Sequence, residues 1–433
     1  MTLNLHDNCL VQLAATLTQA LGQIEVRNRM FLGSGASDRL IGLDAILPQT
    51  GKVQEALQKY IGESPFVDFV SETLSRELYE QQTFQSNEIK PLSEIEPYAD
   101  FGSLASRLVT EFNSLPWRYT ITVALPAAFS RLFCEHIGKF DISDTISIRK
   151  GESLKEEFPL ISGIAKRDEA IAGGGLLSSP AAAEWKNDFA YLQIRIVGFF
   201  GKYSATEPQR QAVDTIRSFF GICIAQRLMK PNWTYTLYST PEKYYIHKHT
   251  DGNWVPLEAE NLETRHSELI RGLVMDDLNG HSDTDESLVR RMKIELNTMS
   301  ALYRNAERAQ HLILAAQWLL DSYCGNDELL QFVQAAVVVE ILLGDKASSD
   351  QTGLGELLAN RCAYLIANTH TQRADILVQF RKIYDIRSKI VHRGKSRLTV
   401  FERNLLSKLR WLCFRIIQEE ARLIEKDVKE GQP

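Results

Sequence analysis

The chain has 433 residues, of which 44% are hydrophobic and 24% are charged, and its formal net charge is −6. This composition is typical of a globular chain with room for two or three domains. The acidic total excludes a general nucleic-acid coating protein. The six cysteines show no C-x-x-C spacing and several lie in apolar helical segments, which indicates reduced, buried thiols.

No charged and then apolar leader follows Met1, and no apolar run is long enough to span a bilayer. We therefore expect a cytoplasmic protein without a membrane anchor. Residues 1–115 form a mostly helical N-terminal region in this prediction. Its expected helices cover 10–21, 53–61, 66–78 and 100–112.

The segment Gly33-Ser34-Gly35-Ala36 resembles the start of a nucleotidyltransferase loop. That loop also needs a D-x-D pair, whereas this chain has only the separate Asp38 and Asp44. A glycine turn is the better account. The glycine-rich segment 163–180 lacks the G-K-[ST] ending of a phosphate-binding loop, so we expect a flexible loop there.

Residues 116–255 are predicted to form an α+β domain with a sensory or regulatory role. Alternating β-branched and aromatic residues predict strands at 117–125 and 145–149, and an apolar run predicts a strand at 189–200 that is buried on both faces. A short helix is expected at 127–137. A longer helix at 206–229, with Pro208 at an early position, is expected to stop at Pro231.

Two segments, 233–239 and 244–248, are predicted to form a hairpin around 240–242. His247 and His249 alternate as metal ligands do, but no third ligand follows at a typical spacing. We expect both histidines on the solvent face of a strand, and we expect neither a metal nor another cofactor in this protein.

The polar, acid-rich stretch 251–285 is interpreted as a connection with a short helix at 262–273, and residues 256–300 as the link between the halves. A helix at 286–301 joins it to residues 301–433, which are expected to form an all-helical bundle. The predicted class is thus α+β, mainly helical, with mixed helices and strands before the bundle. Its five helices are expected at 301–323, 327–343, 354–368, 371–393 and 400–426.

Arg387 and His392 lie five positions apart on the basic helix that precedes Gly394. At about 100° per residue, Arg387 falls in an apolar arc with neighbours that include Val391, while His392 points about 140° away. Either the helix loosens near its glycine end, or a second copy faces the first across a twofold axis. The plainer alternative is that Arg387 neutralises a buried carboxylate and His392 is a surface side chain.

Glu340 lies among aliphatic residues on a helix that is apolar nearly all round, so we expect its carboxylate to be buried and to need a cationic partner. Arg387 and Arg361 are the two candidates. A pair with Arg387 would either orient a catalytic arginine or serve the architecture alone.

Residues 304–427 resemble the HEPN superfamily of all-α domains, and within it the ApeA-like branch. The matching segments are 309–323, 336–343, 358–366 and 383–394. The resemblance implies a homodimeric, metal-independent endoribonuclease whose two protomers join their R-x4-H motifs, here Arg387 and His392. Ser388 stands where active members often have Asn, Asp or His. The resemblance also implies antiphage defence, with tRNA among its targets and a phage-derived trigger or a regulatory partner acting on residues 1–300.

RNA cleavage needs only groups that move protons and stabilise charge, because the 2′-OH is the nucleophile. Histidine suits the proton step and arginine the phosphate. The expected products are a 2′,3′-cyclic phosphate and a 5′-hydroxyl. Residues 381–410 hold ten Lys or Arg and two acids, a local excess typical of phosphate binding. The alternative function is a HEPN-fold scaffold that binds RNA or a nucleotide without cleaving it. The basic residues expected to hold the RNA backbone are Lys389, Arg393, Lys395 and Arg397.

Overall fold

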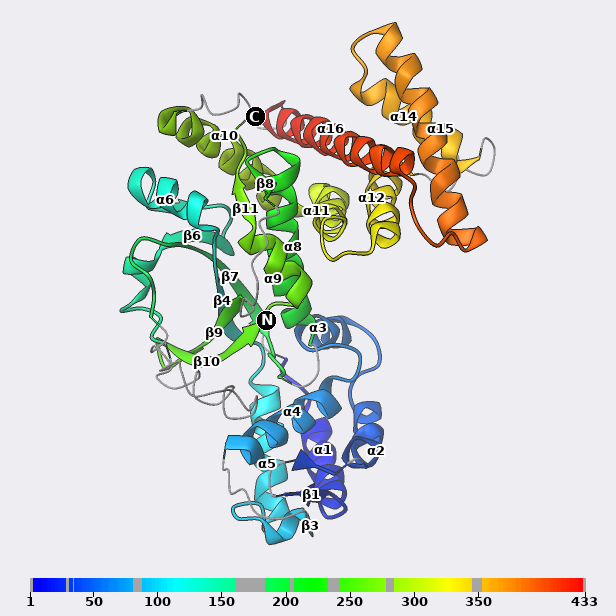
Figure 1. Ribbon diagram of the computed structural model, residues 1–433. Coiled ribbons are helices and arrows are strands. Elements are labelled where there is room, and N and C mark those ends of the chain that lie inside the picture. The colour runs from blue at the N-terminus through cyan, green and yellow to red at the C-terminus, as the bar shows by residue number, and fades with distance from the viewer. Residues whose placement is uncertain are drawn as a thin grey trace. The chain divides into compact units, whose positions relative to one another are not determined.

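The computed structural model confirms the predicted α+β class (Figure 1). By its internal contacts the chain forms two compact units, Met1–Tyr119 with Arg195–Val213, and Thr120–Ile194 with Asp214–Pro433. Among the described helices, none has both the length and the apolar character that crossing a membrane requires. The residues that the structure describes are 3–28, 31–33, 35–80, 88–160, 184–202, 206–232, 242–277, 284–344 and 353–430.

Helices dominate the first unit, and the four predicted there are confirmed. Asp100 begins the last of them, since its carboxylate accepts hydrogen bonds from the backbone N–H groups of Gly102 and Ser103. Phe66 packs edge-on against Phe112 with ring centroids 4.8 Å apart. The helices are α1 (Asp7–Leu21), α2 (Ala36–Leu40), α3 (Lys52–Tyr60), α4 (Pro65–Glu80) and α5 (Phe101–Asn113), with short 3-10 turns at Ile41–Ile46 and Leu92–Glu94.

A small antiparallel sheet in the first unit was not predicted. Its order is β2-β1-β3, formed by Phe31–Leu32, Glu25–Arg27 and Ile89–Pro91. Strands of two or three residues are too short to show an alternating pattern.

A six-stranded sheet of order β10-β9-β4-β7-β6-β5 organises the start of the second unit. The predicted strands in this region are confirmed, and β7 is buried along its first five residues, as the apolar run indicated. The predicted loop at 163–180 lies outside the described residues. The elements up to this point of the chain are β4 (Trp117–Ala124), α6 (Ala127–His136), β5 (Lys139–Asp141), β6 (Ile146–Lys150), a 3-10 turn (Gly151–Leu154) and β7 (Ala190–Gly198).

The predicted hairpin around 240–242 is wrong, because β9 (Lys243–Thr250) pairs with β10 (Asn253–Asn261) instead. The turn is Asp251-Gly252, with φ values of 50° and 85°, which is the Asp-Gly geometry that closes a tight hairpin. The interpretation of 251–285 as a connection therefore fails over β10. The segment 233–239 lies outside the described residues.

The prediction that His247 lies on the solvent face is wrong, because the residue is only 1% exposed. Its Nε2 atom lies 2.9 Å from the carbonyl oxygen of Pro159, and its ring meets Phe158 edge-on. Burial lowers the pKa of His247, so the imidazole stays neutral in the interior. His249 is half-buried against Trp254.

The helix predicted at 206–229 ends earlier, since α8 spans Glu207–Ala225. Arg227 adopts φ 57°, and the Leu228 N–H donates back to the Cys223 carbonyl oxygen. This is a Schellman ending with arginine in the place that glycine usually takes. Pro231 is instead the end of a strand. The elements that follow are β8 (Met229–Pro231), α9 (Thr264–Arg271) and β11 (Leu273–Met275), with β11 antiparallel to β8.

The helices of the last third agree with their predicted positions, because each is long and periodic, and three of them begin at a capping side chain. Thr284, Asp327 and Thr369 accept hydrogen bonds from the first turns of their helices. Four of the six thiols are buried, as expected, while Cys9 and Cys134 are half-buried. The helices are α10 (Asp285–Arg304), α11 (Ala306–Asp321), α12 (Glu328–Leu343), α14 (Leu354–Ile366), α15 (His370–Arg393) and α16 (Val400–Glu430).

Glu295 on α10 makes the stability of this region depend on pH. Burial, reinforced by the charge of Glu425, raises the pKa of Glu295 to about 7. Between its ordinary value of 4.5 and about 7, the folded state holds a proton that the unfolded state has lost, so stability falls as pH rises through this range.

We expect Glu295→Gln to raise Tm above that of the wild type at about pH 8 and to leave it unchanged near pH 4. Parallel Tm–pH curves for the two proteins would contradict this.

Candidate functional site

The candidate site lies near the C-terminal end of α15 (Figure 1). One face of this helix is buried through Ile376, Phe380, Ile383 and Ile386. Gly394 follows with φ 64° and ψ 38°, the left-handed geometry that ends a helix. The backbone is helical through Arg393, so both motif residues lie on a regular helix.

Arg387 forms an ion pair with Glu340 on α12. Its Nε atom lies 3.1 Å from Oε1, without hydrogen-bond alignment, and its Nη2 donates to Oε2 at 3.3 Å. The Tyr384 hydroxyl donates to the same Oε1 at 2.9 Å. Of the two candidate partners of Glu340, the structure therefore selects Arg387; Arg361 donates to the Leu343 carbonyl oxygen instead.

The side chains of this pair are only partly covered. Glu340 is 20% and Arg387 22% exposed, so the expectation of a buried carboxylate is wrong. The reason is the helix face, because Glu340 shares a half-buried face of α12 with Val337 and Ile341, whereas Val338 and Val339 are buried. About a fifth of the Arg387 side chain therefore remains open to solvent.

Tyr384 is held in place by α14. A methyl group at Gly355 would lie 2.8 Å from the Tyr384 ring, so only glycine lets the two helices approach this closely. Burial and the charge of Glu340 raise the pKa of Tyr384, which keeps the hydroxyl protonated as a donor. The ring also lies 5.9 Å from the Arg387 guanidinium carbon.

His392 is exposed, one residue before the helix ends. On a regular helix it lies about 140° around and about 7.5 Å along the axis from Arg387. The first predicted device, a backbone loosened near His392, is absent, and one copy does not aim both side chains at one point. Val391, predicted in the apolar arc, is 46% exposed, and Ser388 is half-buried.

The four basic residues expected to bind RNA form two groups, two lysines that make ion pairs and two arginines that do not. Lys389 lies 2.6 Å from Asp385 and Lys395 lies 2.9 Å from Glu402, so both are partly neutralised. Arg393 and Arg397 are exposed and make no ion pair within the described part of the chain. These two arginines are the better candidates for phosphate contacts.

A buried cluster on α8, α9 and α11 was not predicted. His266 contacts Asp321 at 2.7 Å, Arg217 contacts the other oxygen of Asp321 at 2.5 Å, and Cys324 lies close by. Burial alone would raise the pKa of Asp321, but the hydrogen bonds from His266 and Arg217 lower it. The three ligand types suit a metal, yet Arg217 already neutralises the carboxylate. We assign the cluster a structural role. No short sequence motif indicates it, because His266 and Asp321 are 55 residues apart in the chain.

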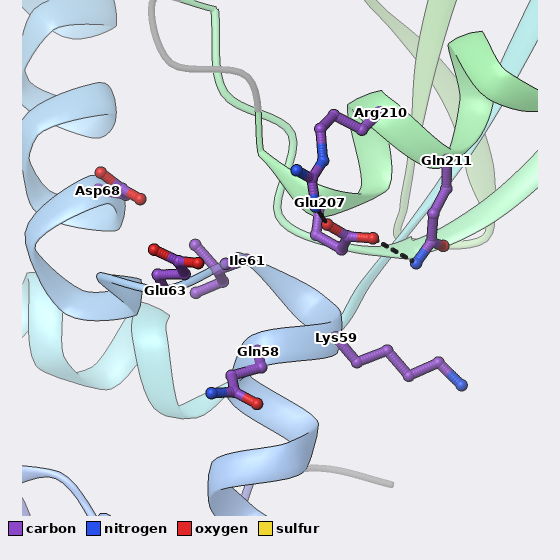
Figure 2. A pocket seen from close by; sticks show the side chains of 9 residues that line it. Gln58, Lys59, Ile61, Glu63, Asp68, Glu207, Arg210 and Gln211 are labelled. Atoms are coloured by element: carbon purple, nitrogen blue, oxygen red, sulfur yellow. Dashed lines mark hydrogen bonds and ion pairs between the residues drawn. The ribbon is translucent and has the colours of Figure 1, made fainter. Parts of the chain in front are cut away.

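The first unit has a polar pocket of about 700 Å³. Figure 2 shows Glu63 and Asp68 on one side, and Glu207 with Arg210 and Gln211 on α8 opposite. Burial, with the charges of Asp44 and Glu72, raises the pKa of Asp68. Because both acidic and basic side chains line the pocket, its charge does not favour one class of ligand.

Searches against protein-family models, curated proteins and solved structures find no match for this chain. The role of each candidate residue stays a prediction from chemistry and from the resemblance described above.

We expect Glu340→Ala to destabilise the protein by about 1–2 kcal/mol, because it leaves a half-buried guanidinium and the Tyr384 hydroxyl without their acceptor. Arg387→Lys keeps a cation beside Glu340 and should cost less. Thermal unfolding measures both, with Glu340→Gln as the control that retains an acceptor for Tyr384. Equal Tm values for Glu340→Ala and Arg387→Lys would contradict the argument.

Proposed function

We propose that the protein is a metal-independent endoribonuclease whose site combines Arg387 and His392 from two copies of the chain. The observation that carries this proposal is the state of the arginine. Glu340 accepts a hydrogen bond from Nη2 and lies 3.1 Å from Nε, so the guanidinium is oriented, while Nη1 makes no ion pair with any described residue. An oriented arginine with an unengaged edge is suited to a phosphate oxygen.

In the proposed reaction His392 takes the proton from the RNA 2′-OH. The 2′-oxygen forms a bond to phosphorus, and Arg387 stabilises the charge that develops on the phosphorane oxygens. The bond from phosphorus to the 5′-oxygen then breaks. His392 of a second copy donates the proton that the leaving oxygen requires, which gives a 2′,3′-cyclic phosphate and a 5′-hydroxyl. Ser388, half-buried between the two, is proposed as a hydrogen-bonding helper.

The geometry of α15 supports a site shared between copies. Arg387 and His392 diverge by about 140° on one helix, so a phosphate between them needs a second helix end. Val391, which lies about 40° from Arg387 around the helix, exposes 46% of its surface. A second copy that covers this side of the helix would bury the exposed valine beside the arginine. Antiphage defence, tRNA as target and a trigger acting on residues 1–300 rest on the resemblance alone.

A second candidate is an RNA-binding scaffold with the same basic helix end. It is favoured by one observation, that no described residue fixes the ring orientation of His392, whereas catalytic histidines are usually held by a third group. This candidate predicts binding without cleavage.

We expect pure wild-type protein to cleave total RNA in the presence of EDTA, and we expect His392→Ala and Arg387→Ala to abolish cleavage. A single general acid–base residue contributes about 10²–10⁴-fold to rate, so the loss should be clear on a gel. Retained binding with no cleavage in any sample would support the scaffold.

A nuclease silenced by a separate partner would look inactive in that assay. Expression in cells distinguishes this case, because toxicity should disappear with His392→Ala. Cells that grow equally with both proteins, together with inactive pure protein, would contradict nuclease activity.

Phosphate contacts predict a salt effect. We expect Arg393→Ala and Arg397→Ala each to weaken RNA binding and to reduce the slope of log Kd against log salt by about 1. Arg422→Ala is the control, since Arg422 is also exposed but is paired with Glu419 near the C-terminal end of α16. Fluorescence anisotropy at several salt concentrations measures the slope. An equal change in all three variants would show that only total charge matters.

A further inference from the structure

An exposed aromatic stripe follows the seam between α15 and α16. Phe401 is 57% and Trp411 43% exposed, although both belong to a helix that is buried on its other face. The two residues are ten positions apart on α16, about 15 Å along its axis and on neighbouring faces. Val378 of α15 is 47% exposed and continues the apolar surface.

Each ring of the stripe has a lysine over it. The Lys382 ammonium lies 5.8 Å from the Phe401 ring centroid, and the Lys408 ammonium lies 4.3 Å from that of Trp411. Lys382 makes no ion pair in the described chain. Lys408 makes only a long ion pair, with its ammonium 3.9 Å from the Asp375 carboxylate. Each ammonium lies over a face of its ring, so a base that stacks on that face takes the place of the lysine, whose flexible side chain can then reach the neighbouring phosphate.

The stripe leads to the candidate site. Around α15, Lys382 and Lys389 lie within about 20° of each other, and His392 lies about 60° beyond Lys389. Asp385 is the acid on this path, and its charge is offset by Lys389 at 2.6 Å. Arg387 and Val391 lie on the other side of the helix, so the surface proposed to meet a second copy does not overlap the stripe.

We propose that this stripe binds single-stranded RNA, with bases stacked on Trp411 and Phe401 and phosphates held by Lys408 and Lys382. The inference rests on the proposed function and names its substrate class as an unpaired RNA segment. Stacking requires bases that are free of a partner strand, so a duplex of the same sequence binds less well.

The test uses full-length His392→Ala protein as the parent, so that RNA stays intact, and a fluorescein-labelled single-stranded oligoribonucleotide. Adding Trp411→Ala or Phe401→Ala should raise Kd about 5- to 100-fold. Trp411→Phe keeps a ring and should restore most of the affinity. Tyr364→Ala is the matched control, because Tyr364 is an aromatic residue of α14 that is 81% exposed and outside the stripe.

Kd values within about twofold of the parent for both alanine variants would overturn the inference. So would a loss of affinity that appears only when sedimentation shows a dimer falling apart, since the stripe would then be a contact between copies. Cleavage by the wild type is scored separately. If the wild type does not cleave RNA but binding still requires Trp411, only the nuclease proposal is contradicted. If the wild type cleaves RNA and binding does not require Trp411, only the RNA-binding role of the stripe is contradicted.

Discussion

The contact between Glu340 and Arg387 is the interaction on which the functional argument depends. It joins α12 to α15 through a carboxylate that accepts from both Arg387 and Tyr384. A guanidinium that is four-fifths covered needs such an acceptor, because an unpaired charge there would be costly. The same contact gives the arginine one direction, and a fixed direction is what separates a phosphate-binding group from a mobile surface cation.

The fold was predictable where a local pattern is long enough to be unambiguous. The helices α12, α15 and α16 repeat an apolar face over several turns and begin at the capping residues Asp327, Thr369 and Thr399, so they lie close to their predicted positions. The failures have local causes. The Asp251-Gly252 turn lies in a polar stretch whose pattern is typical of a connection. Arg227 takes a left-handed conformation that sequence patterns assign to glycine.

The site was predictable in its pairing but not in its geometry. The sequence identified Glu340 as an acid in need of a cation and named Arg387 as a candidate, yet it overestimated how deeply the pair is buried. Helical periodicity separated Arg387 from His392, and the regular backbone of α15 agrees. It could not show that Tyr384 completes the contact, nor that His266 and Asp321 meet, since both depend on how distant segments pack.

Gly355 gives this arrangement an evolutionary signature. A methyl group there would lie 2.8 Å from the Tyr384 ring, so the packing of Tyr384 against Glu340 and Arg387 depends on a glycine on another helix. Positions 355 and 384 should therefore vary together among relatives of this chain. A larger residue at 355 would be tolerated where 384 is smaller than tyrosine, and such proteins would need another donor to keep Glu340 in line.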